Sequence, residues 1–330
     1  MNWPARALAG LYGEPGLSAF PGPGNEDGMD GQTVGFIGLG TMGGPMAQNV
    51  RKRGYEMVVY DLNPNAAVPL VAQGARSATS PREVAAAADV VITMLPDGPD
   101  VEDAILGRDG AIEGLRPGAV LVDMSTIDPE ATRRIGTRLA ERGVRMVDSP
   151  VGKTSEHALS GTLTLMVGGD PADVEAVRPI LDCMGTDFFY CGELGAGEAM
   201  KLINNMLAAT VAGASIEALT LGVRWGLEVE LMLSLMKTTM AWNNALAIAL
   251  PKKALIGDYS LGFMTRLAQK DVRHAVAMAE RLAVPTPTCA AALGGLAEAV
   301  GRGYGAEDAS GSVLRLREEQ AGVRVRLKNI

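Results

Sequence analysis

One lysine and two asparagines at helical spacing are the side chains of this sequence best suited to acid–base chemistry. Lys201, Asn204 and Asn205 occupy positions i, i+3 and i+4 of a helix-like stretch, so they share one face. Burial beside amides would lower the pKa of a lysine toward the working range of a general acid. The residues alone leave two interpretations open. Lys201 either acts on a substrate that the amides orient, or reaches solvent from the start of the helix with the asparagines near its cap.

A glycine-rich turn is the second candidate site, Gly38-Leu39-Gly40-Thr41-Met42-Gly43, which fits G-x-G-x-x-G. A predicted strand precedes it, a helix follows, and Asp61 comes roughly 20 residues later, as in dinucleotide-binding folds. The first glycine permits a tight turn, the second lets a pyrophosphate approach, and the third packs helix on strand. The helix N-terminus would bind the phosphates. Asp61 would bind the ribose hydroxyls and repel a 2′-phosphate, which favours NAD over NADP.

Two more turns follow predicted strands. Ser125 and Thr126 come after Val120–Asp123, and Leu95 and Pro96 end the apolar run that starts at Val90. Ligands of α/β sheets collect at the carboxyl ends of the strands. We therefore expect both turns to line the cofactor cleft.

The elements that must position these residues fall into two parts. In the first part, predicted strands alternate with helices, which indicates a Rossmann domain with a mostly parallel, doubly wound sheet. The predicted strands are Thr33–Ile37, Tyr55–Tyr60, Val90–Met94, Val120–Asp123, Arg145–Asp148 and Thr162–Val167. After Gly195 the pattern is helical throughout, with helices predicted over Glu198–Trp225, Val229–Lys237, Phe263–Leu282 and Thr286–Gly303. We expect a disordered extension over 1–28, a cofactor-binding domain over 29–194, and an all-helical substrate and oligomerisation domain over 195–330.

The composition of the 330 residues argues against several classes of protein. A net charge of −8 disfavours a general nucleic-acid binder. Two His, and three Cys without a C-x-x-C pair, disfavour a metal site, so no metal is expected. The apolar stretch Met206–Val223 contains Glu217 and is predicted as a buried helix of a soluble protein, not a membrane span. Residues 1–28 lack the apolar core of a signal peptide, which favours the cytoplasm.

Three further motifs carry a resemblance to a known family: Asp148-Ser149-Pro150-Val151, Gly161-Thr162-Leu163 and Gly195-Ala196-Gly197-x-x-x-Lys201-x-x-Asn204-Asn205. From about Thr33 to the C-terminus the chain resembles the β-hydroxyacid dehydrogenases, which include 3-hydroxyisobutyrate dehydrogenase and tartronate semialdehyde reductase. The resemblance implies a Rossmann domain followed by an all-α domain of the 6-phosphogluconate dehydrogenase-like type. It also implies nicotinamide-dependent interconversion of a hydroxyl with an aldehyde or ketone.

The resemblance implies roles for individual residues. Lys201 matches the catalytic lysine, which protonates the carbonyl oxygen as hydride arrives. Asn204 and Asn205 would bind and orient the substrate. In the family, the stretch at Ser125 and Thr126 lies near substrate and nicotinamide; we assign Ser125 to the substrate and Thr126 to the cofactor. The match to Lys270 lies near the nicotinamide.

The segment Gly152-Lys153-Thr154 departs from the Ser-Gly-Gly of most family members. A cation and a hydroxyl stand where backbone N–H groups and a hydroxyl bind a carboxylate. The segment is closer to the branch that reduces 3-sulfolactaldehyde, which has Gly-Arg-Thr-Ser here. A sulfonate suits a cation with neighbouring hydroxyl and amide donors. Lys153 in place of Arg leaves sulfonate, carboxylate and phosphate open, because Lys is a point charge and Arg a rigid fork.

The leading hypothesis is an NADH-dependent reductase of a short anionic semialdehyde, with 3-sulfolactaldehyde reduced to 2,3-dihydroxypropane-1-sulfonate as the first substrate to test. The alternative within the class is 3-hydroxyisobutyrate or 4-hydroxybutyrate dehydrogenase. The alternative from another class is a non-catalytic NAD-binding regulator. We also expect a homodimer or homotetramer, because the helical part is short and apolar.

Overall fold

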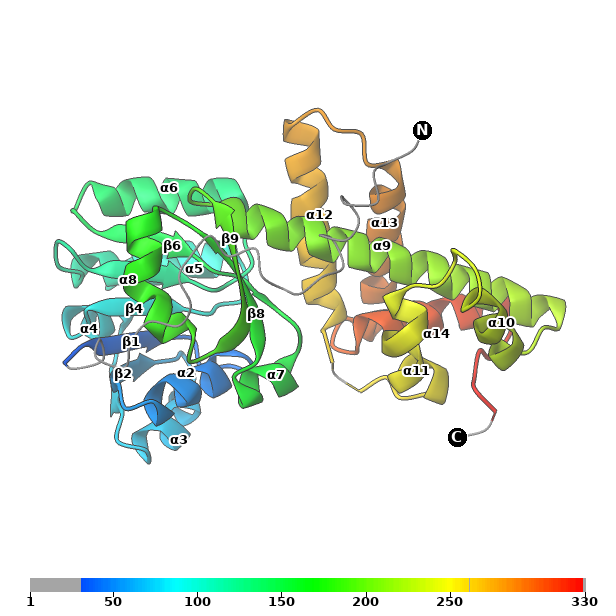
Figure 1. The fold of residues 1–330 in the computed structure, drawn as a ribbon, viewed down its shortest axis with the longest axis horizontal. Helices are drawn as coiled ribbons and strands as arrows, with labels where there is room; N and C mark the ends of the chain where they lie inside the picture. The colour runs from blue at the N-terminus through cyan, green and yellow to red at the C-terminus, as the bar shows by residue number, and fades with distance from the viewer. Residues whose placement is uncertain (1–30, 261, 329–330) are drawn as a thin grey trace, which may run out of the picture.

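The computed structural model describes residues 31–260 and 262–328. The extension predicted over residues 1–28 lies outside them. A body built on a sheet and a body built of helices stand side by side, and the long helix α9 (Ala196–Trp225) leads from one into the other (Figure 1). The last strand of the sheet ends at Gly192, three residues before the N-cap of α9.

Within the described residues, nine strands form one sheet in the order β3-β2-β1-β4-β5-β6-β8-β7, with β9 paired to β8. The strands from β1 to β6 run parallel; β8 is antiparallel to β6, and β9 is parallel to β8. This is the expected Rossmann arrangement. The strands are β1 Thr33–Ile37, β2 Glu56–Tyr60, β3 Arg76–Ser77, β4 Val90–Thr93, β5 Val120–Asp123, β6 Arg145–Asp148, β7 Val151–Gly152, β8 Leu163–Gly168 and β9 Gly185–Gly192.

The central strands are apolar throughout because helices cover both faces of the sheet. Successive residues of β4 alternate between the two cores: Val90 and Ile92 pack in one, and Val91 packs in the other. Helices α2, α3, α7 and α8 contribute to the first core, and α4, α5 and α6 to the second. They are α2 Gly43–Lys52, α3 Val68–Val71, α4 Pro81–Ala86, α5 Gly98–Leu106, α6 Pro129–Ala140, α7 Ser155–Ser160 and α8 Pro171–Leu181.

The second body has its own core around α9, in which Ile216, Leu219 and Leu314 are fully buried. Helices α12, α13 and α14 pack against α9. The helices are α10 Val229–Met236, α11 Leu250–Lys252, α12 Thr265–Arg281, α13 Pro287–Ala299 and α14 Ala309–Ala321, with π-helical turns over Ala245–Ala249 and Val300–Tyr304.

Helix α9 departs in one respect from the buried helix that its composition predicts. By length and hydropathy it could cross a membrane, yet only 22% of its most apolar window is buried. Leu207, Leu221 and Trp225 are 61%, 71% and 85% exposed. The reason is geometric: the packed helices cover part of the circumference of α9 and leave an apolar face open.

Several elements were not predicted from the pattern of the sequence. Strand β9 is half-exposed and contains Asp187, so it lacks the apolar run by which central strands are found. Helix α14 buries Ser312 and Glu318, which breaks its apolar stripe. The short elements β3, β7 and α7 have two, two and six residues.

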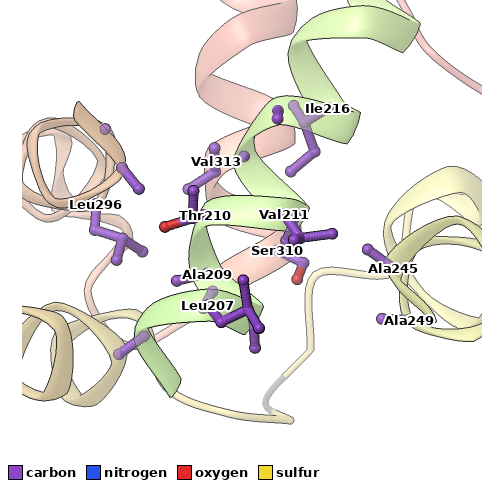
Figure 2. Close-up of a pocket in the computed structure, with 18 of the residues that line it drawn as sticks. Leu207, Ala209, Thr210, Val211, Ile216, Ala245, Ala249, Leu296, Ser310 and Val313 are labelled. Carbon is purple, nitrogen blue, oxygen red and sulfur yellow. The ribbon is translucent and has the colours of Figure 1, made fainter. Parts of the chain in front are cut away.

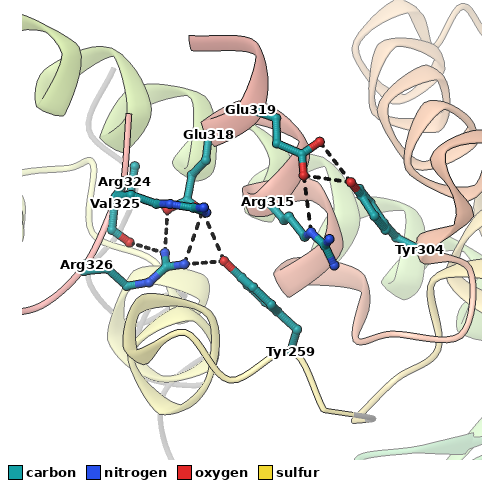
Figure 3. A network of polar contacts seen from close by, with 8 residues as sticks. All are labelled: Tyr259, Tyr304, Arg315, Glu318, Glu319, Arg324, Val325 and Arg326. Atoms are coloured by element: carbon teal, nitrogen blue, oxygen red, sulfur yellow. Dashed lines mark hydrogen bonds and ion pairs between the residues drawn. The ribbon is translucent and has the colours of Figure 1, made fainter. Parts of the chain in front are cut away.

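Glu318 anchors the chain that follows α14 (Figure 3). This buried carboxylate accepts the backbone N–H of Val325 at 2.6 Å, the phenol of Tyr259 at 3.1 Å, and the guanidinium of Arg326 at 2.5 Å. An exposed guanidinium, that of Arg324, contacts it as well. The donors satisfy a charge that would otherwise be costly to bury. Residues 323–328 therefore pack on their own chain.

Candidate active site

The glycine turn lies at the carboxyl end of β1, where the chain enters α2. Gly38 has a φ of +93°, and a Cβ there would stand 2.4 Å from the carbonyl oxygen of Met94. A Cβ on Gly43 would stand 2.0 Å from the carbonyl oxygen of Gly38. By contrast, a Cβ on the exposed Gly40 would meet nothing within 4 Å. The fold itself requires Gly38 and Gly43, while Gly40 leaves open the space in which a pyrophosphate would fit.

Asp61 follows β2 and faces the glycine turn. One of its carboxylate oxygens accepts the backbone N–H of Leu39 at 2.7 Å, and the other accepts the backbone N–H of Asn63 at 2.7 Å. The acid is thus fixed beside the turn, as the spacing predicts. Thr41 is exposed and Met42 half-buried at the start of α2.

The turns after β4 and β5 are joined to each other and to α12. The backbone N–H of Leu95 donates to the hydroxyl of Ser125 at 2.9 Å. The ammonium of Lys270, on α12, donates to the carbonyl oxygen of Pro96 at 2.9 Å and to that of Thr126. Five residues predicted from separate parts of the chain therefore converge at the carboxyl edge of the sheet. In this structure Lys270 braces both turns.

Further side-chain pairs join α12 to the same edge, and none of them was predicted from sequence. His274 contacts the carboxylate of Asp97 at 2.9 Å, and Arg281 contacts that of Asp128 at 2.6 Å. No local sequence signal could have found them, since the partners are more than 150 residues apart. Together with Lys270 they fix the helical body against the sheet body.

Lys201 lies in the second turn of α9 and is 9% exposed. Within the described residues its ammonium has no hydrogen-bond or ion-pair partner. Asn205, one turn further on, donates to Asp271 at 2.7 Å and accepts from Asn204 at 3.1 Å. Burial lowers the pKa of Lys201, and the negative charge of Asp271 opposes that shift. An ammonium that is buried and unpaired is suited to give up a proton.

Three buried carboxyls stand behind the start of α9, and sequence reasoning assigned none of them a role. Burial raises the pKa of Asp123, raises that of Asp148 to about 6, and raises that of Glu198 well above its usual range. Asp148 accepts the backbone N–H groups of Gly195 and Glu198 at 2.7 and 2.8 Å. Glu198 accepts the backbone N–H of Ile127 at 3.1 Å. These bonds tie α9 to β6 and to the turn after β5.

The segment Gly152-Lys153-Thr154 lies at β7, with Gly152 buried. Lys153 has a φ of +76°, a region that favours glycine. Its ammonium contacts Asp187 at 2.6 Å and donates to the carbonyl oxygen of Thr162 at 2.7 Å. The hydroxyl of Thr154 pairs with the His157 ring at 2.9 Å. The predicted anion-binding cation is present, and here a carboxylate of β9 neutralises it.

Comparison with known proteins places this arrangement in a family. Residues 33–192 match the model of the NAD binding domain of 6-phosphogluconate dehydrogenase, and residues 195–316 match that described as NAD-binding of NADP-dependent 3-hydroxyisobutyrate dehydrogenase. The 3-sulfolactaldehyde reductase of Escherichia coli (strain K12) is 38% identical over 89% of this chain and 99% of its own length. The chain belongs to the β-hydroxyacid dehydrogenase family. The NAD-dependent L-serine dehydrogenase of Pseudomonas aeruginosa is 40% identical over 84% of this chain and 95% of its own length.

The fold comparison agrees. The 3-hydroxyisobutyrate dehydrogenase of Mycobacterium tuberculosis, solved with L-serine, superposes with a TM-score of 0.80 at 30% identity over 87% of this chain and 99% of that one. The expected fold class is confirmed: a Rossmann domain followed by a helical domain of the 6-phosphogluconate dehydrogenase type. As a β-hydroxyacid dehydrogenase, the protein is an oxidoreductase that acts on a CH–OH group with a nicotinamide dinucleotide.

The residues present fit that cofactor. Gly40 leaves space over the turn, α2 offers the N-terminus of a ten-residue helix, and Asp61 stands at the end of β2. Within residues 31–260 and 262–328 there is no group of three His, Cys, Asp or Glu side chains that could hold a metal ion.

Two glycine variants distinguish a glycine that the fold requires from one that cofactor binding requires. Gly43→Ala should lower the melting temperature or prevent soluble expression, because the new methyl group collides with the carbonyl oxygen of Gly38. Gly40→Ala should leave the melting temperature unchanged and weaken NADH binding about tenfold or more, since only the approaching pyrophosphate meets that methyl group. Thermal unfolding and fluorescence titration with NADH measure the two effects. NADH binding to Gly40→Ala with wild-type affinity would contradict the assignment.

Proposed function

We propose that the protein is an NADH-dependent reductase of a short aldehyde that carries an anionic group. The observation that carries this proposal is the buried ammonium of Lys201, which has no partner among the described residues and lies one turn before Asn205, on a helix that Glu198 ties to the turn after β5. An ammonium in that position is suited to donate a hydrogen bond to the oxygen of a substrate.

The bound nicotinamide ring would supply the hydride. Lys201 would donate a hydrogen bond to the carbonyl oxygen and transfer its proton as charge develops there. Asn204 and Asn205 would hold the substrate through their amides, and the Asn205–Asp271 bond fixes the second amide in place. In the oxidising direction the same lysine, unprotonated, would accept the hydroxyl proton.

NADH is proposed over NADPH. Asp61 would accept hydrogen bonds from both ribose hydroxyls, whereas a 2′-phosphate would meet its negative charge. The next residue, Leu62, is 90% exposed and offers no cation to a phosphate. Leu39 holds the carboxylate in this orientation through its backbone N–H.

For the substrate we propose 3-sulfolactaldehyde, reduced to 2,3-dihydroxypropane-1-sulfonate. Lys153 and Thr154 support this choice, together with the name of the Escherichia coli relative. A sulfonate would have to replace Asp187 as the partner of Lys153, and a permanently ionised group is suited to that competition. The second candidate is 3-hydroxyisobutyrate or 4-hydroxybutyrate, favoured by the pairing of Lys153 with Asp187, which leaves backbone N–H groups for a carboxylate.

A non-catalytic NAD-binding regulator is the remaining alternative. Lys201 and Asn204 argue against it, because a regulator needs neither a buried ammonium nor the amides beside it. An absorbance change of the nicotinamide with any short hydroxy acid would exclude the regulator. The cytoplasm is the proposed location, because it holds the dinucleotide that the Rossmann domain would bind.

We further propose a homodimer or homotetramer in which a second copy covers the open face of α9. A cavity of about 620 Å³ runs along that helix from Asn204 and is walled by α9, α13, α14 and the π-helical turn Ala245–Ala249. Figure 2 shows Leu207, Val211 and Leu296 among its apolar lining. Every lining residue belongs to the helical body, and two of them, Asn204 and Asn205, also belong to the proposed substrate site.

Lys201→Ala should lower turnover by about 10²–10⁴-fold, the usual worth of a general acid, while NADH still binds. Steady-state kinetics and fluorescence titration measure both quantities. Retained turnover would remove Lys201 from the mechanism.

Lys153→Gly should raise the Michaelis constant for the anionic substrate more than it lowers turnover, because it removes ground-state binding. Glycine also suits a φ of +76°, so the fold should not suffer. Kinetics with sulfolactaldehyde, succinic semialdehyde, methylmalonate semialdehyde and tartronate semialdehyde test the substrate itself. A higher catalytic efficiency with any carboxylate analogue than with the sulfonate would reject the first choice.

Leu221→Glu should dissociate the oligomer, because it places a charge on the open face of α9. Val68→Glu, at a site 60% exposed on α3, is the matched control and should leave the mass unchanged. Light scattering after size-exclusion chromatography measures the mass. A monomeric wild-type protein would contradict the proposal.

A further inference from the structure

Two buried cations and two buried carboxyls surround the reacting end of the proposed site. Lys201 and Lys270 come from α9 and α12; Glu198 and Asp271 stand beside them on the same two helices. The exposed fractions of Glu198 and Asp271 are 0% and 2%. Charges this far from water interact strongly, so the partner of each matters for the chemistry of Lys201.

The two lysines differ in how their protons are used. Lys270 donates to the carbonyl oxygens of Pro96 and Thr126, and its Nζ lies 3.3 Å from a carboxylate oxygen of Asp271. Lys201 has no such partner among the described residues. Lys270 is therefore fixed as a structural cation, whereas Lys201 keeps its donors for a substrate.

The two carboxyls also differ. One oxygen of Asp271 accepts the Asn205 amide at 2.7 Å, and the other faces Lys270 without a hydrogen bond. Asp271 therefore has both a cation and an amide donor as neighbours. Glu198 accepts only the backbone N–H of Ile127, its second oxygen has no partner, and its neighbours include Asp123 and Asp148. Buried among carboxyls, Glu198 is disfavoured as an anion.

Helical geometry brings Asp271 to the face of α9 that carries Lys201. Asn205 is four residues after Lys201, so the two side chains project from the same side of the helix. The amide of Asn205 touches Asp271 directly. The carboxylate of α12 thus lies against the row that contains Lys201, and its oxygen without a hydrogen bond is an acceptor that this row lacks.

We propose that Asp271 is a positioning residue, which holds the ammonium of Lys201 in its charged form and aligns the amide of Asn205. It acts through those two side chains and does not touch the reacting atoms. The groups that face Lys201 are then Asp271 as counter-charge, Lys270 as opposing cation and Glu198, a carboxyl whose burial disfavours its anion. The inference rests on the proposed role of Lys201.

The test is the pH at which Lys201 loses its proton, measured without catalysis. A brief pulse of acetic anhydride acetylates unprotonated amines, and mass spectrometry of the Lys201 peptide across a pH series gives the midpoint. Exposed Lys52, on α2, is the internal reference. In Asp271→Asn the amide can still accept from Asn205 but the charge is gone. The midpoint of Lys201 should fall by about one pH unit.

Glu198→Gln is the matched control and should leave the midpoint near that of the wild type. Asp271→Glu restores the charge and should return the midpoint toward it. Lys270→Met, which removes the opposing cation, should raise the midpoint. This variant tests the same charge balance if Asp271→Asn proves unstable in thermal unfolding.

An unchanged midpoint in Asp271→Asn, or an equal shift in Glu198→Gln, would overturn the inference. So would a fall of the midpoint in Lys270→Met. In the reducing direction the falling limb of the rate–pH profile should move with the labelling midpoint. If labelling shifts while Lys201→Ala retains full turnover, the proposed function fails and the electrostatic role of Asp271 stands.

Discussion

The attachment of α9 to the sheet through Asp148 is the contact on which the candidate site depends. A single carboxylate at the end of β6 accepts two backbone N–H groups from the first turn of the helix. Those groups have no partner within a helix, and a negative charge beside them is favourable. The bond fixes the rotation of α9 about its axis at the place where it leaves the sheet. Lys201 lies one turn later on the same helix. The bonds to Asp148 therefore also set the direction in which the Lys201 side chain leaves the helix.

The fixed start of α9 explains why charged groups are tolerated in this interior. Asp148 accepts two backbone N–H groups and Glu198 accepts one, while Lys270 of α12 donates to two carbonyl oxygens and forms an ion pair with Asp271. Each of these groups is partly neutralised by bonds between elements. Lys201 is the exception, because its ammonium has no hydrogen-bond or ion-pair partner among the described residues, and buried ionisable groups with a lowered pKa are typical of functional sites. The network therefore provides rigidity and leaves one group free to react.

Much of the fold could be predicted from the sequence because its signals are local. Thr33–Ile37, Val120–Asp123 and Arg145–Asp148 have the predicted bounds, since each is a short apolar run that ends at a turn. The glycine spacing likewise located the turn and Asp61. Strand β9 escaped prediction because most of its residues are only partly buried, so it lacks an apolar run. The roles of Asp271 and Asp97 escaped because their partners lie on elements distant in sequence, and spacing carries no information about such contacts.

The two ends of the candidate site follow different physical rules. At the proposed reacting end, Lys201 is buried, has no partner among residues 31–260 and 262–328, and lies on a helix whose first turn is bonded to the sheet. At the other end, Lys153 occupies a left-handed backbone position, and its ammonium is already bonded to Asp187 and to a carbonyl oxygen. The backbone strain is sustained because those two bonds offset it. An anionic group that binds there would replace the Asp187 carboxylate as the partner of Lys153. Its net affinity would reflect the difference between its own ion pair with Lys153 and the pair that Asp187 forms. Selectivity between acids would thus depend on Asp187 of β9, whereas proton transfer would depend on Lys201 of α9.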